Sequence, residues 1–119
     1  MRFALLCYNS EAMIGRLSKS AEEAMMARLR LAEGRIRERA RILSSLCFMP
    51  TTTATYVKAG ERPLVLDGPY NQTKEQLLGL WIIDCDRLSD AIEAGQELAR
   101  EPDLGAIEIR PLRASGGGD

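Results

Sequence analysis

Three charged residues lie close together between positions 67 and 75, and their types suit acid–base chemistry. Asp67 opens the turn Asp67-Gly68-Pro69, and Lys74 and Glu75 follow shortly after it. A carboxylate near a lysine in a partly buried turn can act as a general base, while the lysine can bind an anionic substrate group. Structural alternatives stay open: Asp67 can bond the backbone of its own turn, and Lys74 and Glu75 can form a surface pair.

Further polar residues come from the end of the first expected strand, where Tyr8 and Glu11 lie, and from Tyr70 in the turn. Because that turn leads directly into a central strand, we expect the two segments to meet at one edge of the sheet. Polar groups held beside an apolar seam are typical of a small-ligand site. The candidate site therefore has Asp67 and Glu75 as catalytic residues and Tyr8, Glu11, Tyr70 and Lys74 as substrate-binding residues.

Charge and residue types argue against nucleic-acid and membrane-surface binding. The net charge is −1, histidine is absent and aromatic residues make up 5% of the chain, so neither a basic field nor a stacking platform is expected. Six arginines fall between Arg28 and Arg41, but Glu33 and Glu38 interrupt them. We interpret this segment as a solvated helix face whose arginine stems cover the rim of the core.

The three cysteines, Cys7, Cys47 and Cys85, are far apart and each lies in apolar sequence. We therefore expect buried free thiols in a reducing compartment, and no metal site, since no two of them have ligand spacing. The only glycine-rich stretch, 116–118, precedes no helix, so no phosphate cradle or cofactor is expected. No apolar run approaches the roughly 20 residues of a membrane span, and the first run is too short for a signal peptide. Cytoplasmic localisation is the prediction.

Apolar periodicity predicts two helices. Ser20 is the expected N-cap of the first, which carries an apolar stripe at Met25, Leu29, Ala32, Ile36, Ala40 and Leu43. Asp86 is the expected N-cap of the second, and Pro102 stops it. The expected buried face of the second helix consists of Leu88, Ala91, Ile92, Leu98 and Ala99.

Strands are expected at 3–8, 42–48, 51–58, 63–66, 77–85 and 106–110, with 51–58 and 63–66 forming a hairpin. Without that hairpin the order is βαββαβ, an α+β ferredoxin-like arrangement with two helices on one face of an antiparallel sheet. Strands 3–8 and 80–83 are apolar on both sides, so the face without helices needs a cover as well. A second copy of the sheet is the simplest cover, and we predict a homodimer.

The segment Asp67-Gly68-Pro69-Tyr70-Asn71-Gln72-Thr73-Lys74-Glu75-Gln76-Leu77-Leu78-Gly79 resembles the D-G-P-F-x-E-T-K-E-Q-x-G-G signature of YCII-related proteins of the DGPF type. The resemblance extends to Tyr8–Glu11, to 50–55, to 87–91 and to 107–111. It implies one domain over 1–113, a dimeric α/β barrel paired through its sheets, and a pocket near the dimer interface. Residues 114–119 are expected to form a disordered Gly/Ser tail.

This chain departs from the signature at three positions: Tyr70 replaces phenylalanine, Gln72 replaces glutamate, and Leu78 replaces a glycine. The histidine–aspartate pair of some YCII-like relatives does not carry over, because histidine is absent. Two functional hypotheses stay open. One is an enzyme or binding protein for a small molecule, with its pocket at the dimer seam. The other, implied by the resemblance, is a non-catalytic interaction module with a partner of the sigma-factor type.

Overall fold

The main sheet contains four strands, β1 (Arg2–Asn9), β2 (Arg41–Cys47), β5 (Gln76–Asp84) and β6 (Ala106–Pro111), in the order β2-β5-β1-β6. Each neighbouring pair is antiparallel. This α+β topology is compatible with the expected ferredoxin-like arrangement. The structure, a computed structural model, describes residues 1–113, so the expected tail at 114–119 lies outside the described residues.

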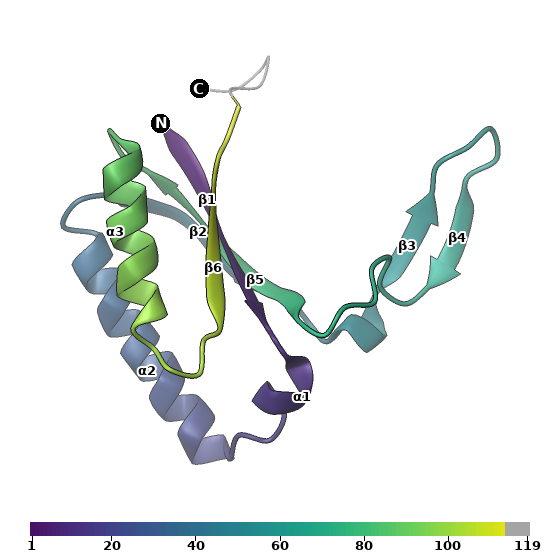
Figure 1. Ribbon diagram of the computed structural model, residues 1–119, viewed down its shortest axis with the longest axis horizontal. Helices are drawn as coiled ribbons and strands as arrows, with labels where there is room; N and C mark the ends of the chain where they lie inside the picture. Colours follow the sequence, from purple (N-terminus) through teal and green to yellow (C-terminus); the bar gives the residue numbers. More distant parts are fainter. Residues whose placement is uncertain (114–119) are drawn as a thin grey trace.

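The two long helices, α2 (Lys19–Ile36) and α3 (Leu88–Ala99), cover the same face of this sheet (Figure 1). Between them and the sheet lies the core, whose largest fully buried side chains are Phe3, Leu5, Ile83 and Leu98. Trp81 is also buried on this side, as a core residue, and its indole N–H donates to the Glu33 carboxylate at 2.8 Å.

The first long helix begins and ends earlier than its sequence pattern predicts. Ser18, not Ser20, is its N-cap, and the Ser18 hydroxyl accepts from the Ala21 N–H at 3.1 Å. The helix ends at Ile36, so Ala40 and Leu43 are not part of it. The chain must turn after Ile36 for β2 to start at Arg41 and pair with the end of β5. Sheet pairing therefore overrides the local apolar periodicity.

The buried face of α3 also differs from the expected one. It consists of Ala91, Ala94, Gly95 and Leu98, whereas Leu88, Ile92 and Ala99 are exposed. The cause is a close approach to β6: a Cβ on Gly95 would lie 3.0 Å from the Ile109 side chain. Small residues are needed at such a contact, so the larger ones point outward. Asp86 is not the cap, because Arg87 holds that position and provides no side-chain hydrogen bond.

Two short helical segments occur that the sequence pattern does not predict. Helix α1 (Glu11–Ile14) follows β1 directly, and the 3-10 helix η1 (Thr51–Thr53) occupies the start of the expected strand 51–58. Only β3 (Thr55–Lys58) is extended there, and it pairs with β4 (Leu64–Asp67) in a separate two-stranded sheet. We call residues 55–67 the arm.

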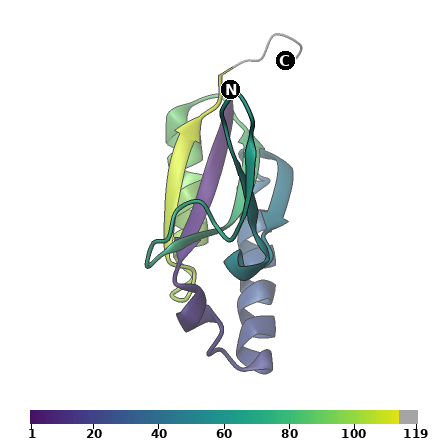
Figure 2. The same ribbon diagram turned by 90° about the vertical axis from the view of Figure 1, so that its right-hand side faces the viewer.

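The arm stands away from the main sheet, on the side opposite the helices (Figure 1). The view turned by 90° shows it in front of the sheet (Figure 2). Its base is closed by a hydrogen bond at 2.8 Å from the Gly68 N–H to the Ala54 carbonyl oxygen. The expected turn is confirmed at this point, since Gly68 has φ of 90°, a value that favours glycine.

The side of the main sheet away from the helices, here called the open face, is apolar at its centre. Side chains alternate between the two sides of a strand, and residues paired across strands share a side, so the open face follows from the strand register. It carries Ala4, Leu6 and Tyr8 of β1, Leu46 of β2, Leu80 and Ile82 of β5, and Glu108 and Arg110 of β6. Leu46 is 53% exposed and Leu6, Leu80 and Ile82 are half-buried.

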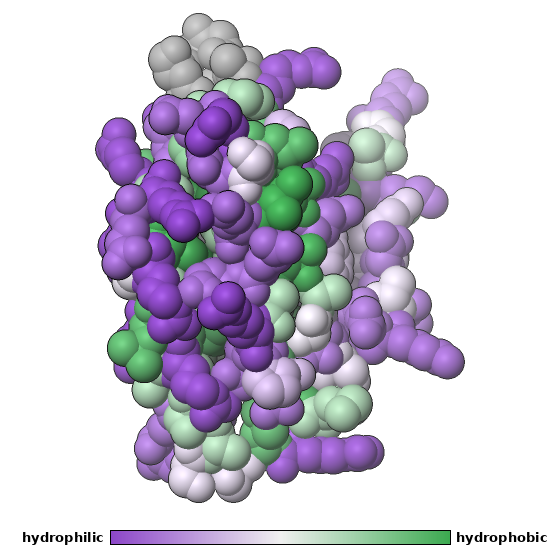
Figure 3. Space-filling view, turned by 60° about the vertical axis from the view of Figure 1, so that its left-hand side comes forward, coloured by the Kyte–Doolittle hydropathy of each residue, from purple (hydrophilic) through white to green (hydrophobic). Residues whose placement is uncertain are grey.

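Hydrophilic side chains cover most of the surface on the side of the molecule that carries the helices (Figure 3). No helix within residues 1–113 is both long and apolar enough to cross a membrane. The open face differs from the helical side in that its apolar side chains adjoin one another across β2, β5 and β1.

Candidate functional site

One cluster of ionisable side chains lies at the β6 side of the open face. The Tyr8 hydroxyl donates to Glu108 Oε1 at 3.3 Å, and Arg110 lies two residues further along the same strand. Desolvation raises the pKa of Tyr8 above its usual value, and the negative charge of Glu108 adds to the shift. A phenol, a carboxylate and a guanidinium beside an apolar surface provide both a proton donor and an anion-binding group.

Glu11 is fixed at the end of β1 by η1. Its carboxylate accepts from the Thr51 backbone N–H at 2.9 Å and from the Thr51 hydroxyl at 2.5 Å. Its own backbone N–H donates to the Gln76 side-chain oxygen at 3.0 Å, at the first residue of β5. The Glu11 carboxylate thus ties η1 to the end of β1, and its oxygens already have donors.

Asp67 and Tyr70 lie at the base of the arm. Asp67 is exposed and pairs with Thr55 across the two strands, and within residues 1–113 its side chain has no hydrogen-bond partner. The ring of Tyr70 packs edge-to-face on Tyr56 with centroids 5.5 Å apart, yet 70% of Tyr70 stays exposed. The alternative in which the Asp67 side chain bonds the backbone of its own turn is not seen within residues 1–113, and the backbone hydrogen bond from Gly68 to Ala54 closes the turn instead.

Lys74 and Glu75 are exposed in the segment that leads into β5. The carbonyl oxygen of Glu75 accepts from the Thr73 hydroxyl, and no ion pair joins Lys74 to Glu75 within the described chain. Of the six expected site residues, Tyr8 and Glu11 thus lie near the end of β1 in separate contacts. Asp67, Tyr70, Lys74 and Glu75 lie along the segment from the arm to β5, and no hydrogen bond or ion pair joins these two groups in the described residues.

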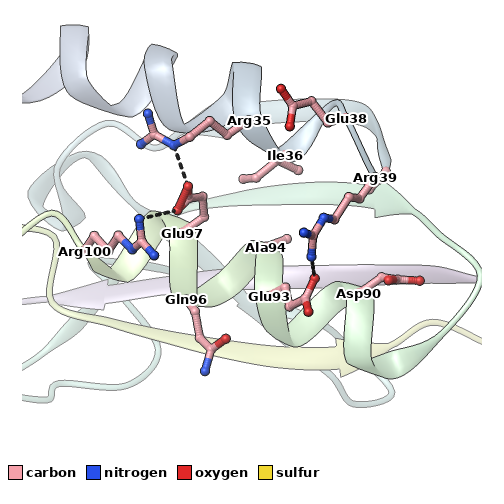
Figure 4. Close-up of a pocket in the computed structure, with 11 residues that line it drawn as sticks. Arg35, Ile36, Glu38, Arg39, Asp90, Glu93, Ala94, Gln96, Glu97 and Arg100 are labelled. Carbon is pink, nitrogen blue, oxygen red and sulfur yellow. Dashed lines mark hydrogen bonds and ion pairs between the residues drawn. The ribbon is translucent and has the colours of Figure 1, made fainter.

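A groove of about 300 Å³ lies elsewhere, between α2 and α3 (Figure 4). Ion pairs cross it from Arg35 to Glu97 and from Arg39 to Glu93. Arg28 continues the series with a bidentate pair to Glu101, at 2.6 and 2.8 Å. These arginines therefore attach α2, and the turn that follows it, to α3 and to the segment just after α3. This groove contains none of the expected site residues, and its charges are used in holding the helices together.

The expectation of three buried thiols is wrong for Cys47, which is exposed, whereas Cys7 and Cys85 are buried. Cys47 is the last residue of the edge strand β2, where it pairs with Gly79 of β5. Burial raises the pKa of the Cys7 thiol to about 11, and nearby Cys47 adds to the shift. Among residues 1–113, no three histidine, cysteine, aspartate or glutamate side chains gather closely enough to hold a metal ion.

The structure also adds residues that the site hypothesis left out. Glu108 and Arg110 alternate with Ile107 and Ile109 along β6, a pattern that already placed them together on one side of their strand. Only the pairing of β6 with β1 puts Glu108 within reach of Tyr8, 100 residues earlier. No sequence pattern indicated that Thr51 would contact Glu11, because that hydrogen bond forms only where the chain brings η1 back to the end of β1.

The domain is of the α+β class. It has an antiparallel sheet with two helices on one face, ionisable groups at the edge of the other face, and a separate hairpin. Its sequence matches the YCII-related domain family over residues 1–114. It is also 37% identical over 115 residues to the uncharacterized protein R00369 of Rhizobium meliloti (strain 1021), covering 94% of this chain and 92% of that protein. The chain belongs to the YCII-related family. The narrower DGPF type stays a prediction from the motif.

Proposed function

We propose that this chain is a homodimer that binds a small organic molecule, with its binding site at the seam between two paired open faces. The observation that carries the proposal is the open face itself, an apolar surface without helices and with the Tyr8–Glu108 pair at its rim. A partner sheet over such a surface would exclude water from the rim. Convergent polar groups beside dry apolar surface are the usual components of a ligand site.

The proposed ligand carries an acidic group. Arg110 and Lys74 supply positive charge for a carboxylate or a phenolate, and Tyr8 supplies a hydroxyl. Asp67 or Glu75 would act as the base if a reaction follows binding, since both carboxylates are exposed and have no cation paired with them in the described chain. Glu11 is better suited to positioning, because Thr51 already donates to both of its carboxylate oxygens.

An NMR screen of small carboxylic acids and phenols against the dimer tests this proposal. We expect an acid in the screen to cause chemical-shift changes in the wild type. Titration of that acid should give an apparent affinity at least tenfold weaker for Tyr8→Phe and for Lys74→Met than for the wild type. Neither substitution removes a buried contact, because the hydroxyl bond that Tyr8→Phe removes is exposed and Lys74 is exposed. The melting temperatures of both variants should therefore match that of the wild type.

Asp67→Asn distinguishes binding from chemistry at the same site. It keeps the shape of the side chain, so a base at this position predicts retained binding and lost turnover. Glu93→Gln, between the two helices, is the matched control and should bind as the wild type does. If the wild type gives no shifts with any acid in the screen, the ligand proposal is wrong.

A further inference from the structure

Within residues 1–113, the arm packs against little besides Tyr70, whose ring contacts Tyr56. Strands β3 and β4 pair with each other, and neither makes extensive contact with another helix or strand of the described residues. A two-stranded hairpin by itself is marginally stable in water at best. The arm therefore needs a surface to pack against.

Apolar side chains lie on both sides of the arm. Val57 pairs with Val65 on one side, and they are 61% and 70% exposed. Tyr56 pairs with Leu66 on the other side, next to Leu64. A hairpin with one solvated side would have polar residues along that side. The polar residues of the two strands, Thr55, Lys58 and Asp67, are divided between the two sides, so each side also presents apolar surface suited to contact with protein.

The total exposed surface is large for a chain of this size. It amounts to 8605 Å², whereas a compact monomer of 13.2 kDa is expected to expose roughly 6,400 Å². Even if residues 114–119 counted as fully exposed chain, about 600 Å², an excess of roughly 1,500 Å² would remain. Stable complexes bury about 800 Å² per partner, and obligate dimers bury more. The excess matches an obligate interface that includes the arm as well as the open face.

We propose that the arm of each subunit packs against the main sheet of a second copy of this chain, so that two arms clasp the dimer. This inference rests on the sheet-paired dimer proposed above and adds the arm to its interface. The arm stands on the side of the sheet that the open face occupies (Figure 1), so a second sheet seated there lies beside it. A two-fold axis gives both subunits the same contact.

The clasp also bears on the ligand site. Asp67 and Tyr70 belong to the base of the arm, whereas Tyr8 and Glu108 belong to the sheet. When the arm packs against the partner, Asp67 and Tyr70 are held at a defined position beside the seam between the two sheets. The site is therefore complete only in the dimer.

Removal of the arm tests the inference directly. Because Ala54 and Gly68 are hydrogen-bonded at 2.8 Å, residues 55–67 can be replaced by a two-glycine linker without moving the rest of the chain. We expect the dimer dissociation constant, measured by analytical ultracentrifugation, to rise at least tenfold while circular dichroism shows the helices retained. An unchanged dissociation constant overturns the clasp.

A substitution test avoids any change of chain length. Val57→Lys with Val65→Lys keeps the arm and charges one of its sides, and should also weaken the dimer at least tenfold. Leu31→Lys is the matched control, because Leu31 is 65% exposed on α2, on the helical side. It should leave the dissociation constant unchanged. Equal effects of the arm and control variants would count against the clasp.

Photo-crosslinking identifies what the arm touches. Val65 is replaced by p-benzoylphenylalanine, and chains labelled with ¹⁵N are mixed with unlabelled chains before irradiation. We expect cross-links between labelled and unlabelled chains, ending in peptides that carry strands of the main sheet. Cross-links confined to one chain would show that the arm folds back on its own sheet, and cross-links only to another protein would show a different partner. Either result rejects the inference.

The two proposals fail in different ways. A wild type that stays monomeric at micromolar concentration removes the dimer and the clasp together. If the wild type is a dimer and its dissociation constant does not depend on the arm, only the clasp proposal is wrong.

Discussion

Glu101 is a buried carboxylate, and its bidentate pair with Arg28 has a measurable signature in pH. The hydrogen bonds from Arg28 hold the pKa of Glu101 below its usual value. A lowered folded-state pKa stabilises the fold above the unfolded value, near 4.3, and that stability is lost as pH falls through the folded pKa. Because half of the Arg28 side chain is exposed, Glu101→Gln should cost only about 1 kcal/mol at pH 7.

Urea unfolding of the wild type and Glu101→Gln at pH 7 and at pH 3 measures this effect. The difference in unfolding free energy should shrink at the lower pH, because the Glu101 carboxylate of the unfolded chain is protonated below its own pKa, near 4.3. Glu93→Gln is the control, since both members of the Arg39–Glu93 pair are largely exposed; its effect should stay within about 0.5 kcal/mol. A difference for Glu101→Gln that does not change with pH contradicts the assignment.

The three thiols should differ in reactivity with iodoacetamide. Cys7 and Cys85 are buried and burial raises the pKa of each thiol, whereas Cys47 is exposed. The thiolate is the reactive form, so Cys47 should be alkylated first at pH 8 and the other two only after unfolding. Mass spectrometry of the digested protein reads out the order. Fast modification of Cys7 in the folded protein would contradict the burial seen at β1.

At the scale of elements, the close packing of α3 on β6 sets a size limit at Gly95. A Cβ there lies 3.0 Å from Ile109 and 3.6 Å from Ile107. Gly95→Val should therefore lower the unfolding free energy by roughly 1–3 kcal/mol through overpacking. Gly34→Ala, in α2 with open space around it, is the matched control and should stabilise by about 0.5–1 kcal/mol. Urea unfolding measures both, and equal signs for the two changes would contradict this packing.

At the scale of the whole molecule, the open face predicts assembly. We expect light scattering at micromolar concentration to give twice the chain mass of 13.2 kDa. Leu80→Asp places a charge at the centre of that face, and desolvation of an unpaired charge costs several kcal/mol. The variant should be a folded monomer, because Leu80 lies opposite the helical core. A Leu80→Asp dimer as tight as the wild type would exclude pairing through this face.

The sequence by itself determined the elements whose signals are local. The apolar strands β1 and β5, the hairpin and the turn at Gly68 follow from residue type and short spacing, and the order of the elements indicated the sheet and helix layers. The end of α2 at Ile36 and the small-residue face of α3 could be seen only in the tertiary structure. Strand register ends α2 before its apolar periodicity does, and close packing on β6 selects small residues for the buried face of α3. Apolar periodicity predicts buried positions from hydropathy alone, whereas the packing of α3 on β6 also depends on the size of each side chain.

The candidate site depended still more on tertiary structure. Residue types picked out Tyr8, Glu11 and the Asp67–Glu75 segment, yet their partners, Glu108 and Thr51, are 100 and 40 residues away from Tyr8 and Glu11, respectively. Such contacts arise from strand pairing and from the path of the chain through η1, and a single sequence carries no local signal for either. The exposure of Cys47 and the projection of the arm were likewise beyond sequence reasoning, because each depends on how the other helices and strands pack around it.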